Sequence, residues 1–130
     1  MKTIIAGSRT ITDMDILLDA IVQSKFHISE VVCGAAKGAD ELGYRWGNTK
    51  GIPVVIFPAN WRDHGKSAGP IRNDHMAEYG DALIAIWDGE SKGTKHMISS
   101  AKKSGLKVYV HLYKDCHGTD APIGVENFFD

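Results

Sequence analysis

The residues of this chain that could do chemistry gather in four short glycine-containing segments, at residues 7–9, 34–40, 65–73 and 88–94. Each segment falls between an apolar run and a helical pattern, so each is expected to join a strand to a helix. At such a junction the backbone N–H groups lack helical partners, and the helix dipole adds positive potential. The four segments therefore predict a site for an anion, such as a phosphate or diphosphate.

Polar side chains in these segments suit the same ligand. Arg9 and Arg72 carry guanidinium groups, which bind phosphate or carboxylate through two parallel hydrogen bonds. Asn73 could read a ribose or a base edge, and Trp61 could stack on a base. Three carboxylates lie near the same segments, and any of them could bind ribose hydroxyls or act as a general base: Asp40, Asp88 and Glu90.

Each segment also has a simpler interpretation. The glycines of residues 34–40 could form an anion-binding nest, or a tight turn with close helix packing. Ser91 could cap the following helix, and Asp88 and Glu90 could cap the turn before it. An arginine is most often part of a surface ion pair. For residues 34–40, and for Asp88 and Glu90, both interpretations stay open. The position of residues 91–94 where the strand order reverses favours ligand binding there, and the position of the two arginines favours the same role for them.

The predicted ligand-binding residues are Gly7, Ser8, Arg9, Gly34, Gly38, Asp40, Trp61, Lys66, Arg72, Asn73, Gly89, Ser91, Gly93 and Thr94. The predicted catalytic residues, if the protein is an enzyme, are Arg72, Asp88 and Glu90. The histidines and cysteines do not have the spacing of metal ligands, so no metal site is predicted, and no cofactor is expected.

Five apolar runs alternate with helical patterns, which predicts an α/β protein. Strands are expected at residues 3–6, 30–33, 53–57, 82–87 and 107–112. Helices are expected after an N-cap at Thr12, over residues 39–48 and 71–79, and from Gly93, with a long loop at residues 58–69. The alternation predicts a single Rossmann-like domain of three αβα layers, around a parallel five-stranded sheet in the order 3-2-1-4-5.

The composition fits a soluble globular protein, with 43% apolar and 24% charged residues. The net charge of -1 argues against a dedicated nucleic-acid binder. No apolar run is long enough to span a bilayer, and the first residues have the pattern of a strand rather than a signal peptide. Two cysteines without a disulfide pattern fit a reducing compartment. A cytoplasmic protein without membrane or nucleic-acid partners is therefore expected.

Together these residues resemble the YspA-type, cpYpsA-related branch of the SLOG superfamily, from Thr3 to about His111. The pieces that carry the resemblance are Gly7-Ser8-Arg9, Gly34-x-x-x-Gly38-Ala39-Asp40, Pro58-Ala59-Asn60-Trp61, the stretch from Gly65 to Met76, Asp81-x-Leu83-Ile84-Ala85 and Gly93-Thr94. The superfamily includes Lonely Guy phosphoribohydrolases, DNA-processing protein A, and nucleotide sensors beside bacterial and phage defence systems. The resemblance implies a SLOG-type domain at residues 1–112 and a C-terminal extension at residues 113–130.

The resemblance also implies a function. It indicates a protein that binds a nucleotide or nucleotide-derived ligand, as a sensor or sequestering protein in a phage or defence context. The alternative is an N-glycosidase acting on nucleoside 5′-monophosphates or NAD-type compounds, and the second alternative is a DNA-binding module.

Two further expectations follow from the superfamily. In Lonely Guy enzymes a glutamate serves cleavage of the glycosidic bond, and Met97 stands at its position here. Slow or undetectable hydrolysis is therefore expected unless Asp88 or Glu90 replaces that acid. Superfamily members often dimerise, and Met76 and Tyr79 form a helical stripe that is predicted to face the partner in a homodimer.

Overall fold

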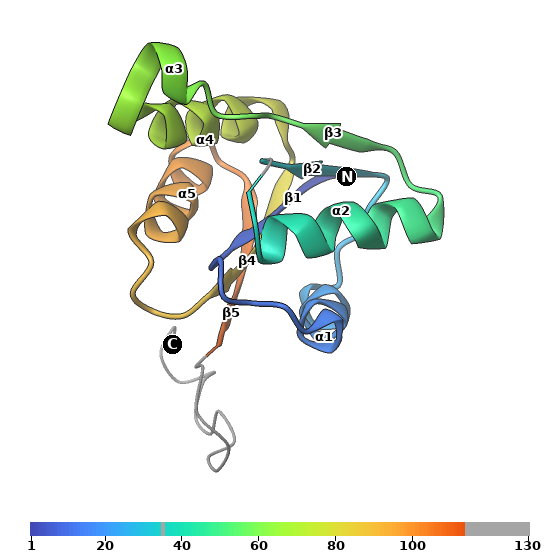
Figure 1. Cartoon of the computed structure of the whole chain (residues 1–130). Coiled ribbons are helices and arrows are strands. Elements are labelled where there is room, and N and C mark those ends of the chain that lie inside the picture. The colour runs from blue at the N-terminus through green and yellow to red at the C-terminus, as the bar shows by residue number, and fades with distance from the viewer. Residues whose placement is uncertain (35, 114–130) are drawn as a thin grey trace.

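Five parallel strands form one sheet in the order β3-β2-β1-β4-β5, as the sequence predicted (Figure 1). The strands are β1 (Lys2–Gly7), β2 (Glu30–Cys33), β3 (Val54–Ile56), β4 (Ala82–Trp87) and β5 (Lys107–Leu112). The chain order reverses between β1 and β4, which pair in register from Thr3 opposite Ala82 to Gly7 opposite Ile86. The segments that follow these two strands therefore lie side by side at the carboxyl edge of the sheet, where α/β proteins bind ligands.

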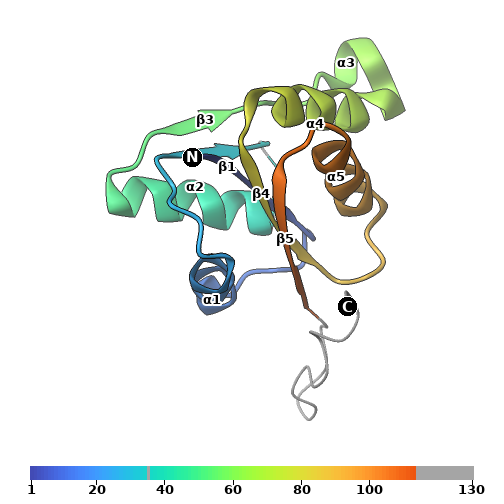
Figure 2. The ribbon, with the colours of Figure 1, turned by 180° about the vertical axis from the view of Figure 1, so that it is seen from behind.

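Helices cover both faces of the sheet (Figures 1 and 2). The helices α1 (Met14–Ser24) and α2 (Ala39–Lys50) pack on one face, and α4 (Ala68–Tyr79) and α5 (Lys92–Lys103) pack on the other. Successive strand residues point to opposite faces. Ile5 and Ile84 therefore belong to the core under α1 and α2, whereas Ile4 and Leu83 belong to the core under α4 and α5. The predicted three-layer arrangement is confirmed.

The cap of α1 differs from the prediction. The carboxylate of Asp13 accepts a hydrogen bond of 2.9 Å from the amide of Asp15, so Asp13 is the N-cap and the helix begins at Met14. Thr12, the predicted cap, lies one residue outside. Aspartate and threonine are both good caps, and the backbone places the carboxylate rather than the hydroxyl over the free amides.

Residues 58–69 do not form the long loop that was predicted. The side chain of Asn60 accepts a hydrogen bond of 3.2 Å from the amide of Asp63 and donates one of 2.9 Å to its carboxylate. This reciprocal cap starts the short helix α3 (Trp61–His64), and a 3₁₀ turn, η1 (Gly65–Ser67), leads directly into α4 at Ala68. The segment therefore holds a defined position beside the start of α4 (Figure 1).

Met76 and Tyr79 do not form the exposed stripe on which the predicted homodimer rested. Met76 is 1% exposed in the core, and the hydroxyl of Tyr79 donates to the carboxylate of Glu30. The ring of Tyr79 also packs against Phe57, with centroids 5.4 Å apart. The homodimer stays a prediction without support from these two residues.

The computed structural model describes residues 1–34 and 36–113. Apart from Tyr113, the predicted C-terminal extension therefore lies outside the described residues. Within the described ranges, no helix combines the length and the apolar character needed to cross a bilayer.

Candidate functional site

A cavity of about 330 Å³ opens at the carboxyl edge of the sheet, between the ends of the central strands, α2, α3, α4 and α5. This volume lies in the range of small-molecule sites. The structure brings many of the predicted ligand-binding residues together in its wall. These are Gly7, Arg9, Asp40, Trp61, Arg72, Asn73, Ser91, Gly93 and Thr94.

Arg72 lies at the centre of this wall, on the first turns of α4. Its Nε atom donates a hydrogen bond of 3.0 Å to the side-chain oxygen of Asn73. Its guanidinium occupies the space in front of Gly34, where a Cβ atom would lie 1.9 Å from Nη1 and 2.6 Å from Cζ. Gly34 is therefore accounted for by the room it leaves for the Arg72 side chain, and its predicted contact with a ligand stays untested.

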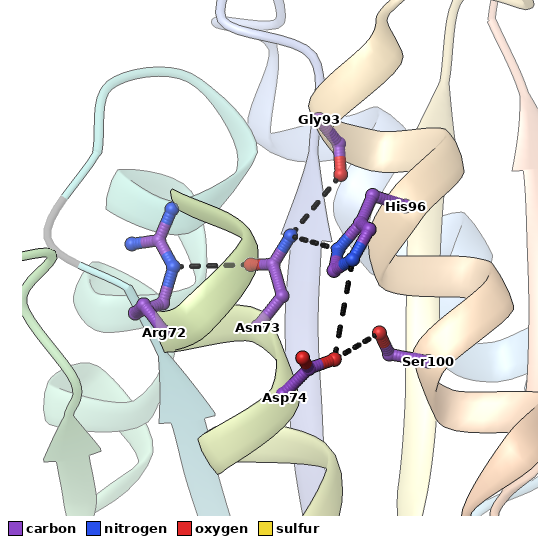
Figure 3. Close-up of polar contacts among 6 residues, drawn as sticks. All are labelled: Arg72, Asn73, Asp74, Gly93, His96 and Ser100. Atoms are coloured by element: carbon purple, nitrogen blue, oxygen red, sulfur yellow. Dashed lines mark hydrogen bonds and ion pairs between the residues drawn. The ribbon is translucent and has the colours of Figure 1, made fainter. Parts of the chain in front are cut away.

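A chain of polar contacts holds Asn73 in one orientation (Figure 3). Its amide nitrogen donates to the carbonyl oxygen of Gly93 and to Nδ1 of His96, both at 3.3 Å. Because Nδ1 accepts, the ring proton of neutral His96 is assigned to Nε2. Nε2 lies 4.0 Å from the carboxylate of Asp74, and the Ser100 hydroxyl donates to the same oxygen at 2.6 Å. The side-chain oxygen of Asn73 is therefore oriented to accept the hydrogen bond from Arg72.

His96 is a wall residue that was not among the predicted ligand contacts. It lies one helical turn after Gly93, so the two share a face of α5. That spacing was a usable signal that His96 lies beside the site. Lys92 and Met97 also line the cavity without having been predicted as contacts, and Met97 is 1% exposed.

Asp40 is a carboxyl group buried in the cavity wall, in the first turn of α2, with 6% of its surface exposed. The backbone amides of Gly34 and Ala36 donate hydrogen bonds to it. Burial raises the pKa of Asp40 to about 7, although Arg72, the two amides and Arg9 act in the opposite direction. The segment after β2 therefore already directs two amides at an internal carboxylate, and this carboxylate changes charge near neutral pH.

Cys33 lies below this group, at the end of β2, and is 2% exposed. Burial and the nearby Asp40 carboxylate raise the pKa of its thiol to about 12, against the effect of Arg72. The thiol is therefore neutral and unreactive at physiological pH.

The start of α5 forms a second part of the wall. Ser91 caps this helix, with its hydroxyl near the amide and the hydroxyl of Thr94, at 3.5 and 3.2 Å. The indole nitrogen of Trp87 donates to the Ser91 carbonyl at 3.0 Å and fixes the cap to the end of β4. A Cβ atom at Gly93 would meet nothing within 4 Å. The helix terminus is thus open to a ligand, and its dipole favours an anion.

Asp88 holds the turn before α5 rather than facing the cavity. Its carboxylate accepts the amides of Glu90 and Ser91 at 2.8 and 2.7 Å. Partial burial would raise its pKa, but these bonds and one from the Ser8 hydroxyl outweigh that effect and lower it. Neither Asp88 nor Glu90 is among the residues that line the cavity.

Ser8 and Gly38 are explained by packing around the site. Ser8 is buried, and its hydroxyl oxygen accepts the amide of Asp88 at 3.1 Å, which joins the loops after β1 and β4. Gly38 has a φ of 80°, and a Cβ atom there would lie 2.3 Å from the Ser8 carbonyl oxygen. Glycine is therefore required where the loops after β1 and β2 meet.

The remaining predicted ligand contacts lie either at the rim of the cavity or outside it. Trp61 is 55% exposed at the mouth of the cavity and lies beside Gly69. Lys66, on η1, and Gly89, in the turn after β4, are not among the cavity residues. The site therefore presents two arginines, a helix terminus, a buried carboxyl group and an exposed indole to one space.

Comparison with known proteins places this arrangement in a family. Residues 1–64 match the sequence model of the YspA, cpYpsA-related SLOG family. The Gene 61 protein of Mycobacterium phage D29 is 36% identical over 117 residues, which cover 82% of this chain and 93% of that protein. The chain belongs to the YspA, cpYpsA-related SLOG family. The resemblance seen in the sequence of this SLOG protein is confirmed.

A solved structure supports the fold of this SLOG protein. The X-ray structure of DNA processing protein A from Streptococcus pneumoniae superimposes with a TM-score of 0.73 at 16% identity. The match covers 98% of the SLOG protein and 55% of that chain, so the protein spans about half the length of this neighbour. At such low identity the likeness shows the shared α/β fold alone.

Proposed function

We propose that the cavity binds a nucleotide or nucleotide-derived ligand, and that the protein acts as a sensor or sequestering protein for it. The observation that carries the proposal is the convergence of Arg9, Arg72 and the N-terminus of α5 on one cavity of about 330 Å³, with the exposed indole of Trp61 at its mouth. Guanidinium groups and a helix N-terminus suit phosphate, and an exposed indole suits a base.

The arrangement supports one orientation of the ligand. The phosphate would lie between Arg72 and the start of α5, because Asn73 links these two elements through Arg72 Nε and the Gly93 carbonyl. The base would then reach toward Trp61 on α3, at the mouth. The 36% identical relative belongs to a phage, so the context we propose for this role is a phage one.

Isothermal titration calorimetry with nucleoside 5′-monophosphates tests the proposal. We expect one site per chain, and Arg72→Ala should weaken binding about tenfold to a hundredfold, since a hydrogen bond to a charged group contributes about 1.5–3 kcal/mol. Arg45→Ala removes a charge of the same kind from α2, outside the cavity, and serves as the control. Equal affinities of the two variants for every monophosphate tested would refute the proposal.

An N-glycosidase is the second candidate, because Asp40 gives the cavity a carboxyl group with a pKa of about 7. A general acid or base works best with a pKa near the working pH. Asp88 is engaged by backbone amides and Met97 supplies no acid, so we expect binding with slow or undetectable release of base. Chromatography of nucleoside monophosphates after long incubation measures this. Rapid release would establish an enzyme, and its loss in Asp40→Asn, Asp88→Asn or Glu90→Gln would identify the acid.

A further inference from the structure

The buried carboxyl group of Asp40 and the proposed anion site depend on the same arginines. Asp40 is 6% exposed and shares the cavity wall with Arg72 and Arg9. A buried carboxylate is tolerated when positive charge and hydrogen bonds compensate for its lost hydration. In the free protein the two guanidinium groups and the amides of Gly34 and Ala36 provide this compensation.

An anion in the cavity changes this balance. A phosphate or sulfate that engages Arg72 and Arg9 takes up part of the positive charge that stabilised the carboxylate. The anion also adds negative charge to the same enclosed space, and a nearby like charge disfavours the ionised form of a carboxyl group. Two anions cannot share this wall at low cost, whereas one anion and a neutral carboxyl group can.

We propose that an anionic ligand enters this cavity together with one proton, which binds to the carboxyl group of Asp40. The inference rests on the proposed function, since it describes how the same site controls its own occupancy. The one bond that forms is the O–H bond of the Asp40 carboxyl group, and solvent supplies its proton. Below neutral pH Asp40 is already protonated, so affinity is insensitive to pH. Above neutral pH affinity falls about tenfold per pH unit until Asp40 is ionised in the complex as well.

Among the groups in this part of the wall, Asp40 is the one that we expect to change its charge above neutral pH. Arg72 on α4 and Arg9 after β1 stay charged throughout. Cys33 on β2 stays neutral, because burial and Asp40 raise its pKa to about 12. Farther along the wall, α5 contributes Lys92 and His96. The variant His96→Gln separates any contribution of this side chain from that of Asp40.

Sulfate is the probe that isolates the effect, because it remains a dianion across the whole range, whereas phosphate and nucleotides titrate near neutrality. Sulfate binding is measured by calorimetry at pH 6, 7, 8 and 9 in pairs of buffers with different ionisation heats, which gives the number of protons taken up. At pH 8 we expect uptake approaching one proton in the wild type and in His96→Gln. In Asp40→Asn we expect no uptake and an affinity independent of pH above 7.

The possible outcomes separate the two proposals. Sulfate binding without proton uptake at pH 8, or uptake that persists in Asp40→Asn, would overturn the inference and leave the proposed function standing. Failure of both sulfate and adenosine 5′-monophosphate to bind at any pH would overturn both. If Asp40→Asn does not fold, infrared difference spectroscopy of the wild type serves instead. A protonated carboxyl band that appears with sulfate at pH 8 supports the inference, and its absence overturns it.

Discussion

Replacing Gly34 by alanine should move Arg72 without unfolding the protein. The new Cβ atom would lie 1.9 Å from Nη1 and 2.6 Å from Cζ of Arg72, whereas an ordinary contact begins at 3.4 Å. The guanidinium must therefore shift by about 1.5 Å or more, the difference between 3.4 and 1.9 Å. It can do so because it is the end of a flexible side chain, and the backbone at Gly34 does not have the positive φ that would itself exclude alanine.

The size of the effect follows from the contacts that the shift removes. The bond of 3.0 Å from Arg72 Nε to Asn73 does not survive a displacement of this size. The bond that Arg72 would make to an anion is lost with it. A hydrogen bond to a charged group is worth about 1.5–3 kcal/mol, so anion affinity should fall about tenfold to a hundredfold. Stability should fall by on the order of 1 kcal/mol or less, because Asp40 can take up a proton when Arg72 leaves.

Calorimetry with sulfate measures the affinity, and urea unfolding measures the stability. Arg45→Ala, which removes an arginine of α2 outside the cavity, is the control and should bind sulfate with wild-type affinity. Gly34→Ala in an Arg72→Ala background should cause little further loss, because both changes remove the same interaction. Wild-type affinity of Gly34→Ala, or fully additive losses in the double variant, would refute the reasoning.

Three further predictions concern stability and the cavity mouth. Burial raises the pKa of Asp40 from 3.8 to about 7. A difference of one in pKa between the folded and unfolded states corresponds to about 1.4 kcal/mol. The protonated carboxyl group therefore makes its full contribution to the free energy of unfolding below about pH 4. The free energy of unfolding should fall by about 4 kcal/mol as the pH rises to 7. When urea unfolding is measured across this pH range, the stability of Asp40→Asn should change less with pH than that of the wild type. Equal pH dependence in the two proteins would contradict this prediction. Asp88→Ala should lower the free energy of unfolding by about 1 kcal/mol, because the amides of Glu90 and Ser91 lose their acceptor. Asp88→Asn should lower it less, and calorimetry should show unchanged sulfate affinity in both variants. Loss of sulfate binding would contradict a purely structural role for Asp88. Trp61→Ala should weaken binding of adenosine 5′-monophosphate by about 1–3 kcal/mol and leave sulfate binding unchanged, and equal losses for both ligands would show that the indole does not contact a base.

The sheet and its order were predictable because the local and the global signals agree. Ala82 to Trp87 is an unbroken apolar run, as a strand covered on both faces requires, and the alternation with helical patterns leaves few topologies. The short helix α3 was missed because it depends on one reciprocal cap between Asn60 and Asp63. Over four residues such a helix has no hydrophobic periodicity to reveal it.

The position of the candidate site was predictable from the sequence, but the role of each residue was not. Glycine spacing shows where the backbone must approach another group closely, but it does not show whether that group is a ligand, a side chain or another loop. Gly34 faces an arginine that lies far along the chain, and Gly38 faces the loop after β1. The part played by His96 depends on α4 and α5 packing together, so that a histidine meets the amide of Asn73. Contacts of this kind arise from the assembled fold, and no local pattern contains them.

The two sides of the cavity differ in how well they can tolerate amino-acid substitutions. The inner wall is tied into the sheet, where Ser8, Asp88 and Trp87 join the ends of β1 and β4 to the cap of α5. The outer rim is carried by α3, whose cap is local to residues 60–63 and whose side chains lie outside the buried core. Substitutions on this rim can alter which base or substituent fits while the anion-binding wall and the core stay intact. Relatives that keep the inner wall can therefore differ in ligand preference through a few surface residues.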